Sequence, residues 1–399
     1  MNKLSVTDLA VRGKRVLVRA DFNVPLQDGE ITDDRRIRES LPTIRWLVDQ
    51  GARVILMSHL GRPKGRRVEA LSLRPVADHL GQLLRQDVRL APDCVGPETR
   101  AHLQGLGDGD VLLLENLRFH ESETANDASF AGELAALGEL YVNDAFGTSH
   151  RAHASMVRVA ERMPQRAMGF LLKKEIDYLG SALSDPARPF VAILGGAKVS
   201  GKIRVIENLL DRVDSLLIGG GMSYTIFKAM GREIGKSLLE EESLGLAENI
   251  LARAGSHAPS RLRLPLDVVA ADRFADDAET TVVDSDSIPP DRDCLDIGPR
   301  TIELYRDVIL GARTVVWNGP MGVFEMPTFA KGTMAVAQAL AEATAAGAVT
   351  IVGGGDSAAA MKQAGLEDEV SHVSTGGGAS LEFLEGRSFP GLEALTDKD

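Results

Sequence analysis

The chain alternates short runs of β-branched and aliphatic residues with longer segments of helical periodicity, and this alternation restricts the folds open to it. The strand-like runs lie at 16–19, 54–57, 111–114, 140–142, 190–194, 215–218, 266–270, 314–317 and 349–352. Between the first of them, the segments 36–50 and 73–86 have helical spacing. Strands that alternate with helices form parallel sheets covered on both faces, so we predict an α/β fold.

These strands are too many for one doubly wound sheet, and 399 residues suit two domains in series. A helix is predicted over 169–183, between the two sets of strands, because its apolar residues recur at helical spacing. This helix joins the domains as a hinge, or it is an ordinary surface helix of one domain.

Charge and cysteine content exclude several classes of protein. The net charge is −12, which argues against a binder of nucleic acid or anionic membranes. Residues 1–168 hold 23 basic and 23 acidic side chains, so the whole acidic excess lies in the second half. The two cysteines follow no disulfide or zinc-ligand spacing and fit a reducing compartment. No apolar leader or long apolar run is present, so we expect a soluble, cytoplasmic protein.

Polar side chains follow the predicted strands of the first half. Ligands of parallel sheets bind beyond the carboxyl ends of the strands, where such side chains converge. Arginine forks match phosphate and carboxylate oxygens, so the set predicts a pocket for a small, multiply anionic substrate. Arginines that are merely solvated or paired with nearby acids are the alternative. The candidates are Asp21, Asn23, Arg36, His59, Arg62, Arg118 and Arg151.

Glycine-rich loops follow the strands of the second half, at 195–202, 219–221 and 353–357, and a further one lies at 376–378. Glycines let backbone amides approach phosphate oxygens, and a following helix adds a favourable dipole. Lys198 and Lys202 are four residues apart, so we expect them on one helix face aimed at this site. Asp356 offers a hard oxygen for Mg²⁺, and Glu325 is a candidate ligand of the ribose.

Two short motifs in this half point to other classes of protein. Residues 196–202 match the GxxxxGK of a P-loop, but Ile203 replaces the hydroxyl residue that binds Mg²⁺. Residues 353–358 match a loose dinucleotide fingerprint without the later acidic residue. A P-loop NTPase, a dehydrogenase and a two-domain solute-binding protein therefore remain as alternatives.

Longer motifs run the length of the chain in a fixed order. They read RADFNVP from Arg19, MSHLGRP from Met57, LENLRF from Leu114, DAFGTSHRAHAS from Asp144, LGGAKVS from Leu194, IGGGM from Ile218, WNGPMGVFE from Trp317, GGGDS from Gly353 and STGGGAS from Ser374. In this order they closely resemble the phosphoglycerate kinase family. One departure is Gly201, which stands where the family usually has aspartate.

The resemblance implies two Rossmann-like domains whose parallel sheets face a central cleft. Residues 1–169 would bind 3-phosphoglycerate, 170–186 would form the hinge helix, 187–385 would bind MgATP or MgADP, and 386–399 would return to the first domain. It also implies a monomer that exchanges phosphoryl groups between ATP and 3-phosphoglycerate, giving 1,3-bisphosphoglycerate and ADP, with no nucleic-acid or membrane partner. A P-loop-like NTPase or another α/β nucleotide-binding enzyme is the alternative function.

By motif position, the resemblance also distributes roles among residues. Asp21, Asn23, Arg36, His59, Arg62, Arg118 and Arg151 would bind phosphoglycerate. The nucleotide would be held by Lys202, Gly220, Asn318, Glu325, Gly353, Gly354, Gly355, Asp356 and Ser357, with Mg²⁺ on Asp356. The catalytic residues would be Arg36, Lys198, Lys202, Gly354 and Gly377.

Overall fold

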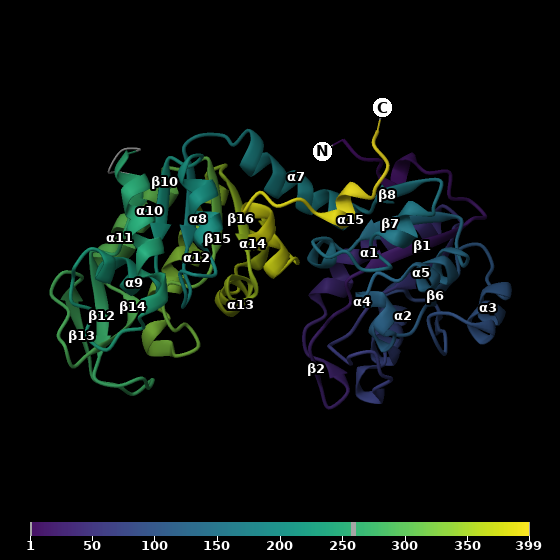
Figure 1. The fold of residues 1–399 in the computed structure, drawn as a ribbon, viewed down its shortest axis with the longest axis horizontal. Helices are drawn as coiled ribbons and strands as arrows, with labels where there is room; N and C mark the ends of the chain where they lie inside the picture. Colours follow the sequence, from purple (N-terminus) through teal and green to yellow (C-terminus); the bar gives the residue numbers. More distant parts are fainter. Residues whose placement is uncertain (1, 257–260, 399) are drawn as a thin grey trace. The chain divides into compact units, whose positions relative to one another are not determined.

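A computed structural model describes residues 2–256 and 261–398 of the chain. It divides into two compact units (Figure 1): unit 1 holds the residues up to Asp177 and those from Ser388 onward, and unit 2 is Tyr178–Arg387. The outermost residues of the predicted domain ranges, 1 and 399, lie outside the described residues. Each unit is built on one six-stranded parallel sheet, which confirms the predicted α/β class.

The sheet of unit 1 has the strand order β5-β6-β4-β1-β7-β8. Its strands are β1 (Arg15–Ala20), β4 (Arg53–Met57), β5 (Val88–Leu90), β6 (Val111–Leu113), β7 (Leu140–Asp144) and β8 (Arg166–Met168). All neighbours are parallel, and the central strands are buried on both faces, as their continuous aliphatic runs predict. A short hairpin, β2 (Leu26–Gln27) and β3 (Glu30–Ile31), follows β1.

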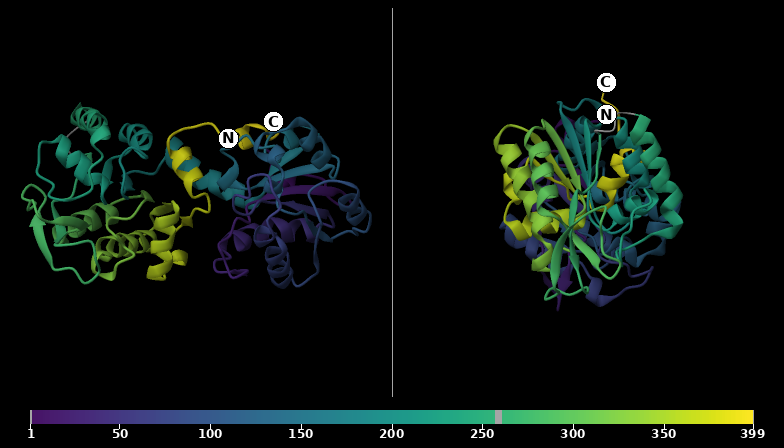
Figure 2. Two further views of the ribbon diagram at one scale, coloured as in Figure 1. Left: turned by 60° about the horizontal axis from the view of Figure 1, so that its bottom comes forward. Right: turned by 90° about the vertical axis from the view of Figure 1, so that its left-hand side faces the viewer.

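Helices cover both sides of this sheet (Figure 2). They are α1 (Arg35–Asp49), α2 (Arg74–Leu84), α3 (Pro97–Gln104), α4 (Glu121–Thr124), α5 (Ala128–Ala135) and α6 (Arg158–Glu161). The burial of Ile37, Leu41 and Ile44 shows why α1 packs here, because residues three and four apart share one helix face. The predicted helices at 36–50 and 73–86 are therefore confirmed as α1 and α2.

The last residues of the chain pack on unit 1. The short helix α15 (Pro390–Glu393) is held there by the Gly391 amide, which donates to the Ser149 carbonyl at 2.9 Å. Near the chain ends, the Leu4 amide donates to the Thr396 carbonyl at 2.9 Å. The two ends of the chain therefore lie side by side (Figure 1).

Unit 2 has the sheet order β11-β10-β9-β15-β16-β17. Its strands are β9 (Phe190–Leu194), β10 (Ser215–Ile218), β11 (Leu262–Arg263), β15 (Thr314–Asn318), β16 (Val349–Gly353) and β17 (His372–Val373). Its helices are α8 (Ile203–Leu210), α9 (Met222–Ala229), α10 (Leu244–Ser256), α11 (Pro299–Leu310), α12 (Lys331–Ala345), α13 (Gly355–Ala364) and α14 (Gly378–Leu384). The predicted helix at 169–183 is α7 (Phe170–Ser184), and the division between the two units falls within it. Among the described helices, none combines the length and apolar character needed to cross a membrane.

One predicted strand has the wrong direction. The run 266–270 forms β12 (Asp267–Ala271), which pairs antiparallel with β13 (Thr280–Asp284) and β14 (Asp293–Ile297) in a separate three-stranded sheet. An aliphatic run shows that a strand is buried but does not set the direction of its partners. Here the partners lie close along the chain, and β13 is largely exposed, so it lacks the apolar pattern that would have predicted it.

Candidate active site

The candidate residues of unit 1 follow neighbouring strands of its sheet. Asp21 comes directly after β1, His59 follows β4, and Arg118 follows β6. Because β6, β4 and β1 are adjacent and parallel, the loops after them lie along one edge of the sheet. The sheet order thus brings together residues almost a hundred positions apart in the sequence.

A hydrogen-bonded network links these loops. Arg36 donates from Nη1 to the Asn23 carbonyl at 3.0 Å, and the same nitrogen lies 3.3 Å from Asp21 Oδ2. Asn23 Oδ1 accepts from the Gly61 amide at 2.8 Å, and Arg118 Nη1 donates to the Gly61 carbonyl at 2.8 Å. Four of the seven predicted residues are therefore joined through one loop, which fixes the orientation of two guanidinium groups.

A buried arginine that sequence reasoning missed lies beneath this network. Arg19 is 1% exposed, and its Nη2 donates to His59 Nδ1 at 3.2 Å. Its Nε donates to Ser155 Oγ at 3.0 Å, and that hydroxyl donates to Glu123 Oε1 at 2.6 Å. One feature of the sequence could have revealed Arg19: it is a charged residue inside an otherwise aliphatic strand. A buried charge of this kind needs hydrogen-bonding partners in the interior.

Burial and the nearby cations leave His59 and His153 neutral. Burial and then the charges of Arg19 and Arg118 hold the pKa of His59 well below its usual 6.5. The same causes, in the same order, lower the pKa of His153, another missed residue, to about 4. Since His59 Nδ1 accepts a hydrogen bond from Arg19, its proton lies on Nε2. Burial, followed by Arg19 and Arg151, lowers the pKa of Arg118 to about 10. Mutual repulsion of this kind is relieved when an anion binds.

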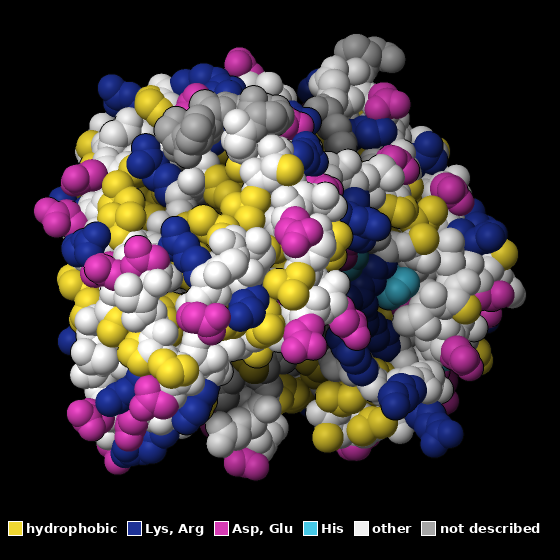
Figure 3. Space-filling model, turned by 60° about the vertical axis from the view of Figure 1, so that its left-hand side comes forward, with side chains coloured by type: hydrophobic (Ala, Val, Ile, Leu, Met, Phe, Trp, Pro, Cys, Tyr) yellow, Lys and Arg dark blue, Asp and Glu magenta, His cyan; other side chains and the backbone are white. Residues whose placement is uncertain are grey.

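The two remaining arginines of the predicted set are exposed. Arg62 makes no hydrogen bond or ion pair with any residue that the structure describes. Arg151 donates from Nε to His150 Nε2 at 2.9 Å. Figure 3 shows Lys and Arg side chains gathered beside a histidine on the right-hand part of the surface. Such exposed guanidinium groups are available for an anionic ligand.

In unit 2 the loops after β9, β10 and β15 are bonded to one another. The Gly196 amide donates to the Pro320 carbonyl at 2.8 Å, and the Gly220 amide donates to the Met321 carbonyl at 2.9 Å. A Cβ on Gly195 would lie 2.0 Å from the Pro320 oxygen, so a side chain cannot be accommodated at this position. The glycines therefore allow a close-packed backbone platform, defined here as residues 195–196, 219–221 and 318–322.

Lys202 reaches under this platform. Its Nζ donates to the Gly195 carbonyl at 2.5 Å and to the Asn318 carbonyl at 2.9 Å. Burial lowers its pKa to about 8, although the charge of Asp356 acts in the opposite direction. The ammonium group is thus held at the carboxyl ends of two strands, close to an acidic side chain.

The prediction that Lys198 and Lys202 share a helix face is wrong. Helix α8 begins only at Ile203, and Lys198 is an exposed residue of the preceding turn. The Glu240 carboxylate accepts from the Val199 amide at 2.6 Å and from the Ser200 amide at 3.0 Å. A side chain from elsewhere in unit 2 therefore accepts hydrogen bonds from the amides of this turn. The spacing of Lys198 and Lys202 gives no sign of such a partner.

The loop after β16 combines a helix start with an unpaired donor. Gly354, with φ of +89°, precedes α13, and Ser357 Oγ accepts from the Gly319 amide at 2.6 Å. Asn318 Nδ2 is buried beside Gly354 and has no hydrogen-bond partner among the described residues. Asp356 is exposed in the first helical turn. Free amides and an orphaned N–H donor at a helix N-terminus favour a phosphate group.

The predicted glycines Gly353 and Gly377 lie at the end of β16 and just before α14. A Cβ on Gly353 would lie 3.3 Å from Ser380 Cβ of α14, so the two segments are in contact. Gly377, with φ of +54°, is the residue before α14. The nearby Ser374 Oγ accepts from the Gly376 amide at 3.1 Å.

A pocket of about 430 Å³ opens beside the platform, wholly within unit 2. It brings together the predicted residues Gly220, Glu325 and Asp356. Gly196, Ala197 and Gly221 of the predicted glycine-rich loops also line it. The remaining lining residues were not predicted as site residues, because they come from several separate segments. They are Tyr224, Lys236, Leu238, Phe274, Asp293, Cys294, Leu295, Pro320, Met321, Gly322 and Val323. Apolar walls with a few charged groups at the rim suit a flat aromatic ligand that carries a polar tail.

Comparisons with known proteins agree with these observations. The family model described as phosphoglycerate kinase matches residues 6–387. The phosphoglycerate kinases of Chloroherpeton thalassium and Chlorobaculum tepidum are each 58% identical to this chain, and each alignment covers 100% of both sequences.

Solved structures give the same result. The phosphoglycerate kinase from Coxiella burnetii superposes with a TM-score of 0.89 at 42% identity, and that from Pyrococcus horikoshii superposes with a TM-score of 0.85 at 34% identity. Both comparisons cover 98% of each chain. The motifs, the two parallel-sheet units and the full-length relatives place this chain in the phosphoglycerate kinase family.

Proposed function

We propose that this chain transfers a phosphoryl group reversibly between ATP and the carboxylate of 3-phosphoglycerate, giving 1,3-bisphosphoglycerate and ADP. The observation that carries the proposal is the pairing of two anion-binding regions on one chain. Unit 1 presents arginines around a neutral histidine, and unit 2 presents an amide-rich helix start beside an apolar pocket. A P-loop-like NTPase is not favoured, because it would not need the arginine cluster of unit 1.

Unit 1 is proposed as the phosphoglycerate domain. Arg62, Arg118, Arg151 and the Nε2–H of His59 would hold the phosphate of the substrate, and Asp21 and Asn23 would orient Arg36 toward its carboxylate. Guanidinium forks bind phosphate and carboxylate oxygens through paired hydrogen bonds. The substrate binds without a metal, which is why this unit needs the larger density of cations.

Unit 2 is proposed as the nucleotide domain. The base would lie in the pocket, Glu325 would face the ribose, and the phosphates would lie against Gly353, Gly354, Gly355 and Ser357. Asn318 Nδ2 is the buried donor that such an oxygen would satisfy. The nucleotide enters with Mg²⁺, and the exposed carboxylate of Asp356 suits an ion that keeps most of its ligands as water and phosphate.

The proposed reaction requires alignment of ATP with the acceptor carboxylate and neutralisation of charge, and it requires no proton transfer. A carboxylate with a pKa of about 4 is already ionised at neutral pH, so no general base is required. In the transition state, negative charge is spread over the three equatorial oxygens of the phosphoryl group and develops on the leaving oxygen. Arg36 and Lys202, with Lys198 and the amides at Gly354 and Gly377, are the groups proposed to offset that charge.

Acceptor-dependent ADP formation tests the whole proposal. The chain should release ADP from MgATP when 3-phosphoglycerate is present and should release almost none without it. ADP formation at the same rate without the acceptor would instead support an NTPase. No turnover in either mixture would favour a binding protein.

Direct transfer also requires the two substrates to come into contact, although the residues proposed to hold them belong to different units. We therefore propose that the units close when both ligands bind. Small-angle scattering with 3-phosphoglycerate and MgADP, a pair that cannot react, should give a smaller radius of gyration than the free chain. An unchanged radius would contradict closure.

Arg62→Ala should mainly weaken binding of phosphoglycerate. Arg62 is exposed, and its proposed contact is with the distal phosphate, which does not change during the reaction. Loss of one guanidinium–phosphate contact should raise KM for 3-phosphoglycerate about tenfold to a hundredfold with little change in kcat. Steady-state kinetics measures both constants. A lower kcat with an unchanged KM would refute this role.

The activity should fall as the pH rises through about 8. Lys202 is the cause, because burial lowers its pKa to about 8 and only the protonated amine can offset phosphate charge. The profile of kcat/KM for MgATP should therefore show a descending limb near this pH. The descending limb of kcat should lie at higher pH, since a bound polyphosphate favours the ammonium form. Lys202→Arg, which stays charged, should remove this limb. An identical limb in that variant would assign it to another group.

The chain is further proposed to act as a monomer in the cytoplasm. Both cysteines, Cys94 and Cys294, are free and buried, which suits a reducing compartment. Sedimentation equilibrium should give the mass of a single chain, and a dimer mass would contradict the first of these two proposals.

A further inference from the structure

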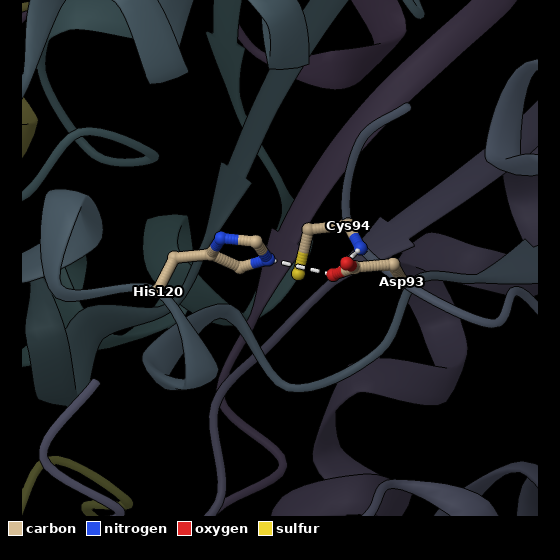
Figure 4. A group of neighbouring side chains, drawn as sticks. All are labelled: Asp93, Cys94 and His120. Atoms are coloured by element: carbon tan, nitrogen blue, oxygen red, sulfur yellow. Dashed lines mark hydrogen bonds and ion pairs between the residues drawn. The ribbon is translucent and has the colours of Figure 1, made fainter. Parts of the chain in front are cut away.

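A carboxylate, a thiol and an imidazole meet in unit 1, outside both regions proposed to hold substrates. Asp93 and Cys94 lie in the loop after β5, and His120 directly follows the short 3₁₀ helix η3 (Leu117–Phe119). One ligand atom from each side chain lies within 4.8 Å of the other two, and Figure 4 shows the three side chains converging. Their spacing along the sequence matches no zinc motif, so only the fold reveals the group.

Neighbouring contacts already orient these side chains. Asp93 Oδ1 lies 2.6 Å from His120 Nε2 and accepts from the Cys94 amide at 2.6 Å. The His120 ring stacks on Phe130, with centroids 4.9 Å apart. Ligand atoms around one tetrahedral zinc ion lie about 3.3–3.7 Å apart, as its bond lengths of about 2.0–2.3 Å require. Shifts of about 1 Å would therefore convert the present arrangement into a coordination sphere.

The electrostatic surroundings favour a cation at this position. Cys94 is fully buried, and its Sγ donates to the Glu115 carbonyl at 3.0 Å. The carboxylates of Asp93, Glu123 and Glu115 act on the position of this sulfur, and the guanidinium of Arg67 opposes them. Carboxylates gathered around one position create a negative potential there, which attracts a divalent cation.

We propose that Asp93, Cys94 and His120 form a binding site for a divalent transition metal of the zinc type. Sulfur and imidazole ligands select Zn²⁺ or Co²⁺ over Mg²⁺, which prefers oxygen. The metal–sulfur bond forms as the thiol proton leaves to solvent, and Nε2 coordinates in the tautomer that carries its proton on Nδ1. Asp93 exchanges its hydrogen bond to His120 for a bond to the metal. Asp93 is half-exposed, so water can reach the fourth coordination position of the metal.

Cobalt titration of the full chain, without a histidine tag, tests the site. Co²⁺ should give the near-ultraviolet charge-transfer band of a thiolate–cobalt bond, saturate at one ion per chain, and be displaced by Zn²⁺ but not by excess Mg²⁺. Cys94→Ser should abolish the band. Cys294→Ser is the matched control, because it removes the other free thiol of the chain and should leave the band intact.

Two further variants keep the test decisive if Cys94→Ser folds poorly. His120→Gln and Asp93→Asn should each raise the Kd for Co²⁺ at least tenfold, while circular dichroism shows that the fold is retained. The proposal is overturned if the wild-type chain gives no band, if the band survives in Cys94→Ser, or if Cys294→Ser removes it.

Discussion

Replacing Arg36 with alanine should lower kcat about a thousandfold while changing KM for 3-phosphoglycerate only a fewfold. Arg36 is half-buried and held by Asn23 and Asp21 at the carboxyl edge of the sheet, so its guanidinium is oriented before substrate binds. A preoriented cation costs no reorganisation when charge develops on the moving phosphoryl group. Removal of a comparable arginine from phosphoryl-transfer sites costs about 10³ to 10⁵ in rate.

Arg38→Ala is the control for this experiment. It lies two residues further along α1, and its Nε bonds to Asp34 Oδ1 at 2.9 Å on the exposed side of the helix. Its removal should change neither constant more than about twofold, because an exposed ion pair contributes little. Arg36→Lys should recover part of kcat. If Arg36→Ala raised KM and left kcat unchanged, Arg36 would be a binding residue only.

Gly195→Ala should destabilise unit 2 by about 3 kcal/mol and weaken MgATP binding at least tenfold. The new Cβ would lie 2.0 Å from the Pro320 oxygen and 2.7 Å from the Gly319 oxygen, and both are backbone atoms that cannot rotate away. The loops after β9 and β15 must separate, which costs overpacking strain. The separation also disturbs the carbonyls that hold Lys202.

Trp317 gives a local measurement of this effect. It is fully buried in β15, and its Nε1 donates to the Gly319 carbonyl at 2.8 Å. In a Trp46→Phe background it is the one remaining tryptophan of the sequence, so urea unfolding followed by its fluorescence reports on unit 2. Gly201→Ala is the matched control, since its Cβ would meet nothing within 4 Å, and it should be neutral or stabilising by about 0.5 kcal/mol. Equal urea unfolding midpoints for Gly195→Ala and Gly201→Ala would show that the platform tolerates a side chain at position 195.

The sequence predicted several residues of the candidate site because they lie just after strand ends. Asp21, His59 and Arg118 are found in adjacent loops for the reason that predicted them, which is that parallel strands share a carboxyl edge. The same reasoning could not find Arg19, which lies inside a strand. Its partners Ser155 and Glu123 come from distant segments, and only packing brings them to it.

Other errors have the same physical origin. The spacing of Lys198 and Lys202 predicted one helix face, but Glu240 binds the intervening amides and α8 begins after them. The run at β12 predicted a parallel strand, although its partners are local and antiparallel. In both cases a partner that the motif or the aliphatic run does not itself identify decided the conformation.

The sequence by itself determined the α/β class, the helix α7 and the family, because periodicity and long motifs lie in consecutive residues. Tertiary structure alone decided which charges are buried, which amides remain free and which side chains line the pocket. It also brought Cys94 close to His120, although the spacing of these two residues in the sequence indicates no metal site. These properties depend on distances between residues far apart in the chain, and burial then sets their protonation and their hydrogen-bonding partners.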